Sequence, residues 1–161
     1  MNEVLAKERI MALLESCNVM SLATCGDNTP WAATVFFVAD QNYSLYFVSG
    51  ETSRHSQHIE ANSLVAATVN QDHDDWLTIT GLQIEGIVSI VSDVQKHDVL
   101  EKYLRKFPSI QRLNANPSSD QERKIAGRLM SSPFYKLQPI NIKLIDNSLG
   151  FGTKMELNFD D

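Results

Sequence analysis

The chain has 161 residues, of which 43% are hydrophobic and 21% are charged. This composition is that of an ordinary globular protein, and the length suits one domain spanning residues 1–161 around one core. The formal net charge is -6 at pH 7 and the sequence pI is about 5.1, so the chain has no general positive field for a nucleic-acid backbone or an anionic membrane surface. We therefore expect no nucleic-acid and no membrane partner, and any anion site has to be local.

The N-terminal segment and the two cysteines indicate a cytoplasmic protein. Apolar and charged residues alternate from Met1 to Cys17, unlike the continuous apolar core of a signal peptide. No apolar run approaches the roughly 20 residues that a membrane-spanning helix needs. Cys17 and Cys25 form neither a CxxC motif nor a disulfide framework, so we interpret both as reduced thiols in the core.

Hydrophobic periodicity predicts an N-terminal helix followed by three antiparallel strands. Val4, Leu5, Ile10, Leu13 and Leu14 recur at the spacing of an amphipathic helix that covers the core. β-Branched and aromatic residues dominate the segments that follow, and the residues between these segments favour tight turns. The strands are predicted over 19–24, 31–39 and 43–48, with turns at 26–30 and 40–42.

The rest of the chain alternates between helix and strand patterns. A helix is predicted over 53–61, a strand over 64–69, a polar turn over 71–75, a long strand over 76–92, helices over 94–107 and 120–130, and a terminal hairpin over 134–144 and 150–159. Gly81 and Gly86 are predicted to mark bulges or sharp coiling that bend the long strand, and Pro108 is predicted to end a helix. Six or more short strands with interspersed helices predict a mainly β fold, a closed or split barrel of Greek-key-like order with flanking helices.

The segment from Leu45 to Ile59 carries the clearest chemical signal. A strand delivers a loop of small residues to the start of a helix that bears hydroxyls, an Arg and a His. The first backbone N–H groups of a helix lack internal acceptors and the helix dipole is positive there, so these groups and Arg54 together could bind a phosphate. The alternative is that Thr52 or Ser53 only caps the helix and Arg54 is solvated, and the spacing itself favours this alternative.

The order of strand, loop, Ser-Arg-basic residue, short helix, Asn and Val-rich strand resembles the phosphate-binding region of the pyridoxamine 5'-phosphate oxidase-like FMN-binding proteins, over about residues 21–92. In that family the Ser and the basic residues hold the phosphate of FMN. The resemblance therefore implies that Ser53, Arg54 and His55 bind this phosphate, with Ser49 on the preceding turn as a further donor.

The match continues toward the C-terminus. The sequences Gly81-Leu82-Gln83-Ile84-Glu85-Gly86, Lys106-Phe107-Pro108 and Asp146-Asn147-Ser148-Leu149-Gly150-Phe151-Gly152-Thr153-Lys154 are similar to those of the bacterial YhbP-like branch of this superfamily. The resemblance implies an FMN-binding split barrel, a homodimer with two equivalent flavin sites at its interface, and a flavin-dependent oxidoreductase acting on a small molecule. Because split barrels host oxidases, reductases, haem-handling proteins and flavin carriers, the alternative is a non-catalytic flavin or haem carrier or sensor.

Further candidate residues lie outside the phosphate segment. Thr34, Val35 and Phe36 are expected to border the flavin ring through backbone groups and apolar side chains. Gln83 could hydrogen-bond the flavin edge or the partner subunit, or be a surface side chain without a specific contact. Lys154 lies in a Gly-flanked motif and could reach the phosphate or the ring from the neighbouring subunit, or be an exposed hairpin Lys.

Two departures from the family pattern alter the expected chemistry. Residues 33–38 contain no basic side chain where the oxidases carry them, so two phosphate contacts are missing. His55 stands where the family has Lys, and its ordinary pKa of about 6.5 makes FMN binding dependent on pH. Phe36 and Phe37 point to opposite faces of a strand, so one of them has to be core. No residue is a convincing general acid or base.

No metal site is expected. His73 lies in an Asp-rich turn at 72–75, whose consecutive side chains rarely converge on one ion, so we interpret it as part of a solvated loop. His97 is expected on an exposed helix face, and no other group has the spacing of a zinc site.

Overall fold

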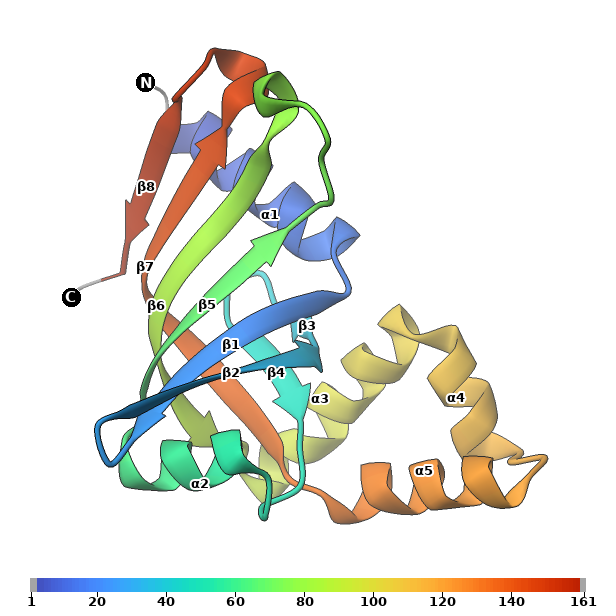
Figure 1. Cartoon of the computed structure of the whole chain (residues 1–161). Helices are drawn as coiled ribbons and strands as arrows, with labels where there is room; N and C mark the ends of the chain where they lie inside the picture. Colours follow the sequence, from blue (N-terminus) through green and yellow to red (C-terminus); the bar gives the residue numbers. More distant parts are fainter. Residues whose placement is uncertain (1–2, 160–161) are drawn as a thin grey trace.

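Eight strands form one curved antiparallel sheet in the computed structural model, which describes residues 3–159 (Figure 1). The strand order is β2-β1-β5-β6-β7-β4-β3, and β8 pairs with the second half of β7. The strands are β1 Val19–Gly26, β2 Thr29–Phe36, β3 Val38–Ala39, β4 Leu45–Val48, β5 Leu64–Asn70, β6 Thr80–Ile90, β7 Phe134–Asp146 and β8 Lys154–Asn158. The mainly β fold that the sequence predicts is confirmed.

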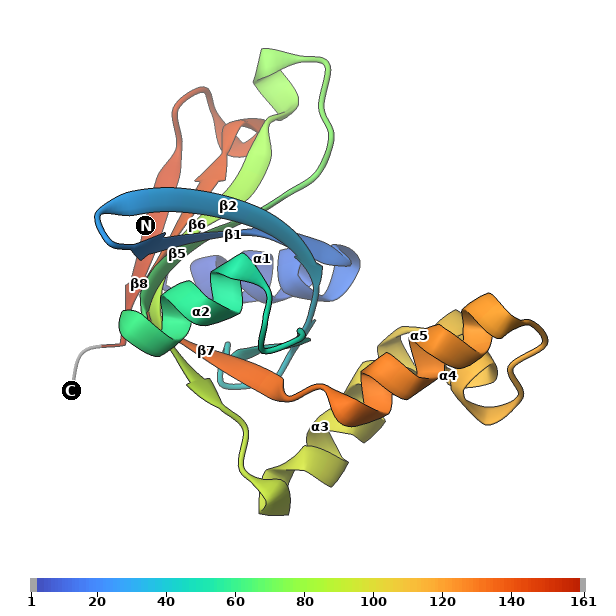
Figure 2. The same cartoon turned by 60° about the horizontal axis from the view of Figure 1, so that its bottom comes forward.

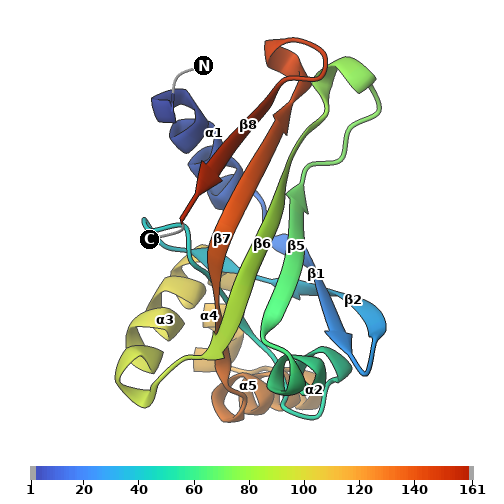
Figure 3. The same cartoon turned by 90° about the vertical axis from the view of Figure 1, so that its left-hand side faces the viewer.

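Five α-helices and two short 3-10 turns flank the sheet within the described residues. They are α1 Glu3–Ser16, α2 Arg54–Ala61, α3 Asp93–Lys106, α4 Pro108–Ala115 and α5 Asp120–Ser131, with η1 Trp76–Thr78 and η2 Asn147–Leu149. Figure 3 shows α1 lying along one face of the upper part of the sheet, and Figure 2 shows α2 crossing the opening of the curl beneath β1 and β2. The helices α3, α4 and α5 form an arm that projects to one side.

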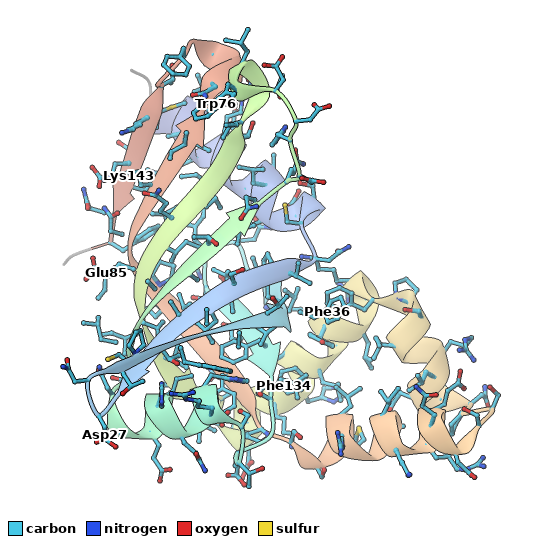
Figure 4. The ribbon with its side chains drawn as sticks, viewed as in Figure 1. Asp27, Phe36, Trp76, Glu85, Phe134 and Lys143 are labelled. Atoms are coloured by element: carbon cyan, nitrogen blue, oxygen red, sulfur yellow. The ribbon has the colours of Figure 1, made fainter. Side chains whose placement is uncertain are left out.

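The β1–β2 hairpin forms because its turn residues accept left-handed backbone angles. Asp27 and Asn28 have φ of 49° and 58°, the pair of positive angles that a two-residue hairpin turn matching the sheet twist requires (Figure 4). Asn and Asp tolerate these angles better than other non-Gly residues. The predicted turn is confirmed, and it leaves β2 as an edge strand that pairs with β1 alone.

A bulge bends β6 and β7 around the core. The pairing register between them shifts at Glu85 and Gly86, as the sequence predicts for Gly86. A Cβ at Gly86 would lie 2.5 Å from the carbonyl oxygen of Gln138, so only glycine fits there. The bulge predicted at Gly81 is wrong, because Gly81 pairs regularly with Asn70 and Ile145.

Apolar side chains form two clusters within the described residues. The larger one fills the curl of the sheet and is covered by one face of α1, as predicted; this face consists of Ala6, Ile10, Leu13 and Leu14. The second cluster joins the arm to the sheet, where the Tyr103 ring packs edge-on against Phe134 (ring centroids 5.5 Å apart) and beside Phe107 (Figure 4). This cluster fixes the position of the arm beside β7.

Three further sequence predictions differ from the structure. Pro108 ends α3 as predicted but also occupies the first turn of α4, a helix the sequence analysis missed. The strand predicted from Trp76 begins only at Thr80, because Asp75 accepts a hydrogen bond from the Leu77 N–H (2.9 Å) and caps the turn η1. Cys17 is buried as predicted, whereas Cys25 is only half-buried.

No helix of residues 3–159 is long and apolar enough to cross a membrane.

Candidate functional site

The start of α2 is shaped by a serine cap. The strand β4 ends at Val48, and the loop that follows reaches Ser53, whose hydroxyl accepts a hydrogen bond from the Ser56 N–H (3.3 Å). The Ser53 carbonyl accepts from the Gln57 N–H (3.0 Å), which is the first backbone bond of the helix. Ser53 therefore caps α2.

The same serine also belongs to a cluster of polar side chains. The Ser49 hydroxyl lies 2.5 Å from His55 Nε2 and 3.3 Å from the Ser53 hydroxyl, and Ser53 lies 3.1 Å from the same imidazole nitrogen. Ser53 donates to the Ser56 hydroxyl at 2.8 Å. Ser49, Ser53 and His55, which the sequence analysis names as phosphate ligands, are thus brought together, and Ser56 is a member that it missed.

Two backbone N–H groups at this helix end have no acceptor among the described residues. They belong to Arg54 and His55, whereas the Ser53 N–H on one side donates to the Gly50 carbonyl and the Ser56 N–H on the other side donates to the Ser53 hydroxyl. Together with the hydroxyls of Ser49 and Ser53, they form what we call the cradle, defined as Ser49, Ser53, Arg54 and His55. Free amides, hydroxyls and the positive end of a helix dipole are the groups that bind a phosphate.

Arg54 lies over an aromatic ring of the neighbouring strand. Its guanidinium carbon is 4.4 Å from the centre of the Trp31 ring on β2, a cation–π contact on a half-exposed Trp. No local sequence pattern pairs these residues, because 22 residues lie between them and only the curl of β2 over α2 brings them together. The contact keeps the one fixed charge of the cradle beside the edge strand.

The two histidines of α2 influence each other. Burial lowers the pKa of His55 below its ordinary value of 6.5, and the nearby His58 lowers it further. His58 is held by a hydrogen bond between its Nδ1 and the Thr24 hydroxyl (3.1 Å) and packs against Gly26, where a Cβ would lie 2.6 Å from the imidazole. His55 in the free chain is therefore mainly neutral at pH 7. The signal for His58 was its i, i+3 spacing from His55.

The edge of β2 offers backbone groups beside the cradle. The Phe37 N–H donates to the Asn18 carbonyl (3.1 Å). Because every second residue of an antiparallel strand forms hydrogen bonds with the same neighbouring strand, the backbone N–H and C=O of Val35 also face β1. Thr34 and Phe36 direct their N–H and C=O groups toward the free edge. Of the three residues expected at the flavin ring, Val35 has a buried side chain and a paired backbone. Phe37 is the core member of the Phe pair, and Phe36 is 54% exposed.

Gln83 lies on the outer face of the sheet, opposite the core. The register places Thr34, Ser21, Thr68 and Gln83 next to one another on four neighbouring strands, all exposed. At about 4.8 Å per strand, Thr34 and Gln83 are roughly 14 Å apart. Along this face, Glu85 follows Gln83 on the same strand, and Lys143 lies opposite Gln83 on β7. Glu85 and Lys143 are both visible at the outside of the sheet in Figure 4.

Lys154 is exposed at the start of β8, opposite Ile145. This end of β8 lies at the top of Figure 1, whereas α2 and the cradle lie at the bottom. Within one chain the structure therefore does not bring Lys154 to the cradle. No group of three or more His, Cys, Asp or Glu in residues 3–159 is placed to hold a metal ion.

The family model described as pyridoxamine 5'-phosphate oxidase matches residues 6–128. The chain belongs to the pyridoxamine 5'-phosphate oxidase family. Among its relatives, a UPF0306 protein of Klebsiella pneumoniae (strain 342) is 28% identical over 148 residues, covering 91% of this chain and 89% of the relative. The UPF0306 protein YhbP of Salmonella schwarzengrund is 29% identical over 126 residues, covering 78% and 74% of the two chains. The YhbP-like resemblance is confirmed.

Solved structures with the same fold include proteins of two kinds. A putative pyridoxamine 5'-phosphate oxidase from Listeria innocua superposes with a TM-score of 0.65 at 21% identity, covering 89% of this chain and 99% of the other. HutZ, the heme storage protein from Vibrio cholerae, superposes with a TM-score of 0.63 at 18% identity, covering 82% and 88%. At this identity the likeness shows the split-barrel fold.

The C-terminal motif that this family member shares with the YhbP-like branch has a structural role. Asp146 accepts hydrogen bonds from the N–H and hydroxyl of Ser148 (3.1 and 2.5 Å), and Asn147 donates to the Trp76 carbonyl (2.6 Å). Gly150 and Gly152 have φ of 132° and 79°, angles that glycine adopts freely. The motif closes the turn between β7 and β8 and ties it to η1.

Proposed function

We propose that this protein binds FMN and acts as a flavin-dependent oxidoreductase on a small molecule. The observation that carries the proposal is the cradle, where two unpaired N–H groups and two hydroxyls lie at the N-terminus of α2, next to Arg54. These groups match the donors that a phosphate monoester accepts, and membership of the family supports FMN as the molecule that carries it.

The residues of the cradle suit this group without rearrangement of the backbone. Ser49 and Ser53 hydrogen-bond to His55 and to each other, and rotation about their side-chain torsions redirects their hydroxyl protons to an anion. Arg54 extends from a ring contact at the surface, so its fork of N–H donors can turn to the same anion. A protonated His55 would add a second positive charge.

The free edge of β2 would hold the ring of the cofactor. The N–H and C=O groups of Thr34 and Phe36 point away from β1, and the exposed Phe36 side chain gives an apolar contact beside them. The bound flavin would supply electron and hydride transfer, while the protein fixes its position and polarity. No side chain is assigned as a general acid or base.

A second copy of the chain is proposed to cover the outer face of the sheet. Exposed apolar side chains occur on all four strands of this face, namely Val19, Phe36, Leu64 and Ile87. Between them, Ala32, Ala23 and Ala66 lie opposite one another on neighbouring strands and leave a flat surface. A two-fold pair would use this face twice and form two equivalent sites.

Titration with FMN and with riboflavin tests the cofactor and the role of the cradle. We expect FMN to bind more tightly than riboflavin, because only FMN carries the phosphate, and Ser53→Ala to remove part of that difference. Equal affinities would contradict phosphate binding by the cradle. Turnover of the FMN-loaded protein with reduced nicotinamide would then support the oxidoreductase over a flavin carrier.

The likeness to HutZ favours haem binding as a second candidate function. The absorption spectrum of the purified protein separates the two, because flavin and haem absorb differently. A flavin spectrum with FMN released on denaturation supports the first proposal, and an intense haem band with no flavin supports the second.

The dimer is tested by a charge placed in the middle of the flat surface. We expect the wild type to have the mass of a dimer in light scattering and Ala23→Arg to dissociate, since the long cation cannot be buried against its own copy. The control is Ala61→Arg at the exposed end of α2. A monomeric wild type at micromolar concentration would contradict the dimer.

A further inference from the structure

A small cavity lies along α2 and the loop that precedes it. It has a volume of about 280 Å³ and is bounded by α2, the loop before it, the end of β6 and the start of β7. The volume is roughly that of nine liquid waters and just below that of a drug-sized site, so the cavity suits a molecule of a few heavy atoms.

A nearly buried tyrosine opens into this cavity. Tyr135 is only 3% exposed, and its ring stacks on Phe47 with the centroids 5.2 Å apart. Within residues 3–159 its hydroxyl has no hydrogen-bond partner, yet it is not one of the enclosed side-chain atoms that lack a hydrogen bond, which are His73 Nε2 and Asp146 Oδ2. The hydroxyl therefore reaches open space at the cavity that Tyr135 lines. A buried polar group is costly without a partner, so this position calls for a ligand or water.

The negative charge of the residues that line the cavity favours a cationic ligand. Glu51 and Glu60 are the charged residues among those that line it, and neither has an ion-pair partner in the described chain. An anion would be repelled by these carboxylates. A metal ion lacks a third ligand, since no group of three His, Cys, Asp or Glu is available there.

The remaining walls are apolar or accept hydrogen bonds. Ile59, Val88 and Ile90 form an apolar side, and Ile90 is 61% exposed. The Ser56 hydroxyl already accepts from Ser53, which leaves one lone pair for a second donor. An ammonium group carries three donors and no acceptor, so it matches a set of carboxylates and hydroxyl oxygens.

We propose that this cavity binds a small organic cation, a primary amine on a short apolar chain. The ammonium group lies between the carboxylates of Glu51 and Glu60 and the Tyr135 hydroxyl. The hydrocarbon chain of the amine packs on the apolar side of the cavity. This site is distinct from the proposed flavin site but adjoins it, because Glu51 lies in the loop between Ser49 and Ser53 and Ser56 hydrogen-bonds to Ser53.

Three matched probes test the proposal on the full chain without added flavin. n-Butylammonium, n-butanol and butyrate have the same chain length and differ in charge, and their binding is followed by backbone amide NMR shifts at constant ionic strength. We expect n-butylammonium to shift the amides around residues 51–60, 88–90 and 135, with at least fivefold weaker binding of n-butanol and none of butyrate.

Variants of the cavity complete the test. Tyr135→Phe keeps the ring on Phe47 and removes only the hydroxyl, and Glu60→Gln removes one charge; each is expected to weaken n-butylammonium binding several-fold. Glu8→Gln, an exposed change on α1, is the control and should have no effect. Equal binding of n-butanol and n-butylammonium, or binding unaffected by both cavity variants, would overturn the proposal. Because no flavin is present, either result is independent of whether the cradle binds FMN.

Discussion

Arg54 is the residue on which we expect phosphate recognition to depend most, because it is the one permanent charge of the cradle. We expect Arg54→Ala to weaken FMN binding by more than tenfold, since a charge-assisted hydrogen bond contributes about 1.5–3 kcal/mol and about 1.4 kcal/mol is a factor of ten. Riboflavin binding should barely change. Fluorescence titration measures both affinities, and equal losses for the two ligands would show that Arg54 acts on the fold or on the ring through Trp31.

If the cradle binds FMN, we expect His55 to make this binding depend on pH. Burial and His58 lower its pKa below 6.5 in the free chain, while a bound phosphate would raise it, so binding takes up a proton between these two values. Affinity should therefore fall as pH rises through this window, from about pH 6 to 8, after the titration of the phosphate itself is removed by comparison with His55→Gln. His55→Lys should flatten the trend, and a pH-independent ratio between the wild type and His55→Gln would contradict the contact.

At the scale of single residues, sequence reasoning identified the cradle and missed its surroundings. Ser49, Ser53 and His55 are within six positions of one another, so a local motif was enough to group them. Trp31 and the pair Thr24–His58 reach α2 only through the curl of the sheet, and no local pattern encodes that contact. Residue spacing predicts which groups meet along one element, but not which strand lies over it.

A lysine near the end of α3 adds polar contacts between the arm and the barrel. Lys106 Nζ donates to the carbonyl of Leu14 (3.1 Å), in the last turn of α1, and to that of Cys17 (2.6 Å), just after the helix. It also lies 4.2 Å from the centre of the Phe37 ring. A cation at a helix C-terminus is favourable because the carbonyls there lack donors. Lys106 thus joins α1, α3 and the segment after β2.

We expect Lys106→Met to lower the free energy of unfolding by about 1–3 kcal/mol, because two carbonyls lose their donor while the apolar stem is retained. Denaturant unfolding measures the change. Lys102→Met, an exposed position on the same helix, is the control and should stay within about 0.5 kcal/mol of the wild type. Equal stability of the two variants would show that water satisfies the carbonyls and that Lys106 does not fasten the arm.

At the scale of elements, the sequence predicted the order of helices and strands well. The errors lie at residues whose local signal fits more than one element. Pro108 is a stop signal for α3 and an accepted first-turn residue for α4, so the same residue fits both interpretations. Trp76 and Leu77 look like strand residues, but the Asp75 cap bends them into η1. The bulge at Gly86 was predictable because a close backbone approach demands glycine.

At the scale of the whole molecule, the residues proposed to contact the flavin lie in three different parts of one chain. The cradle is at the lower end of the barrel, Gln83 is on the outer face, and Lys154 is at the upper end of β8. If Lys154 contacts the cofactor proposed to bind at the cradle, a second chain has to supply it. The family membership and the flat outer face support such an arrangement as a proposal.

Mixed dimers test whether Lys154 crosses between chains. A dimer of Arg54→Ala chains lacks Arg54 in both sites, and a dimer of Lys154→Ala chains lacks Lys154 in both. After subunit exchange in equal amounts, half of the dimers are mixed, and each of these has one site with both residues intact, so about a quarter of all sites should bind FMN tightly. Mixing Arg54→Ala with Ser53→Ala chains is the control, because both changes affect the cradle and each chain keeps its own defect. Recovery in the first mixture alone places Lys154 in the partner's site, whereas no recovery in either mixture leaves Lys154 as an exposed residue of the β7–β8 hairpin.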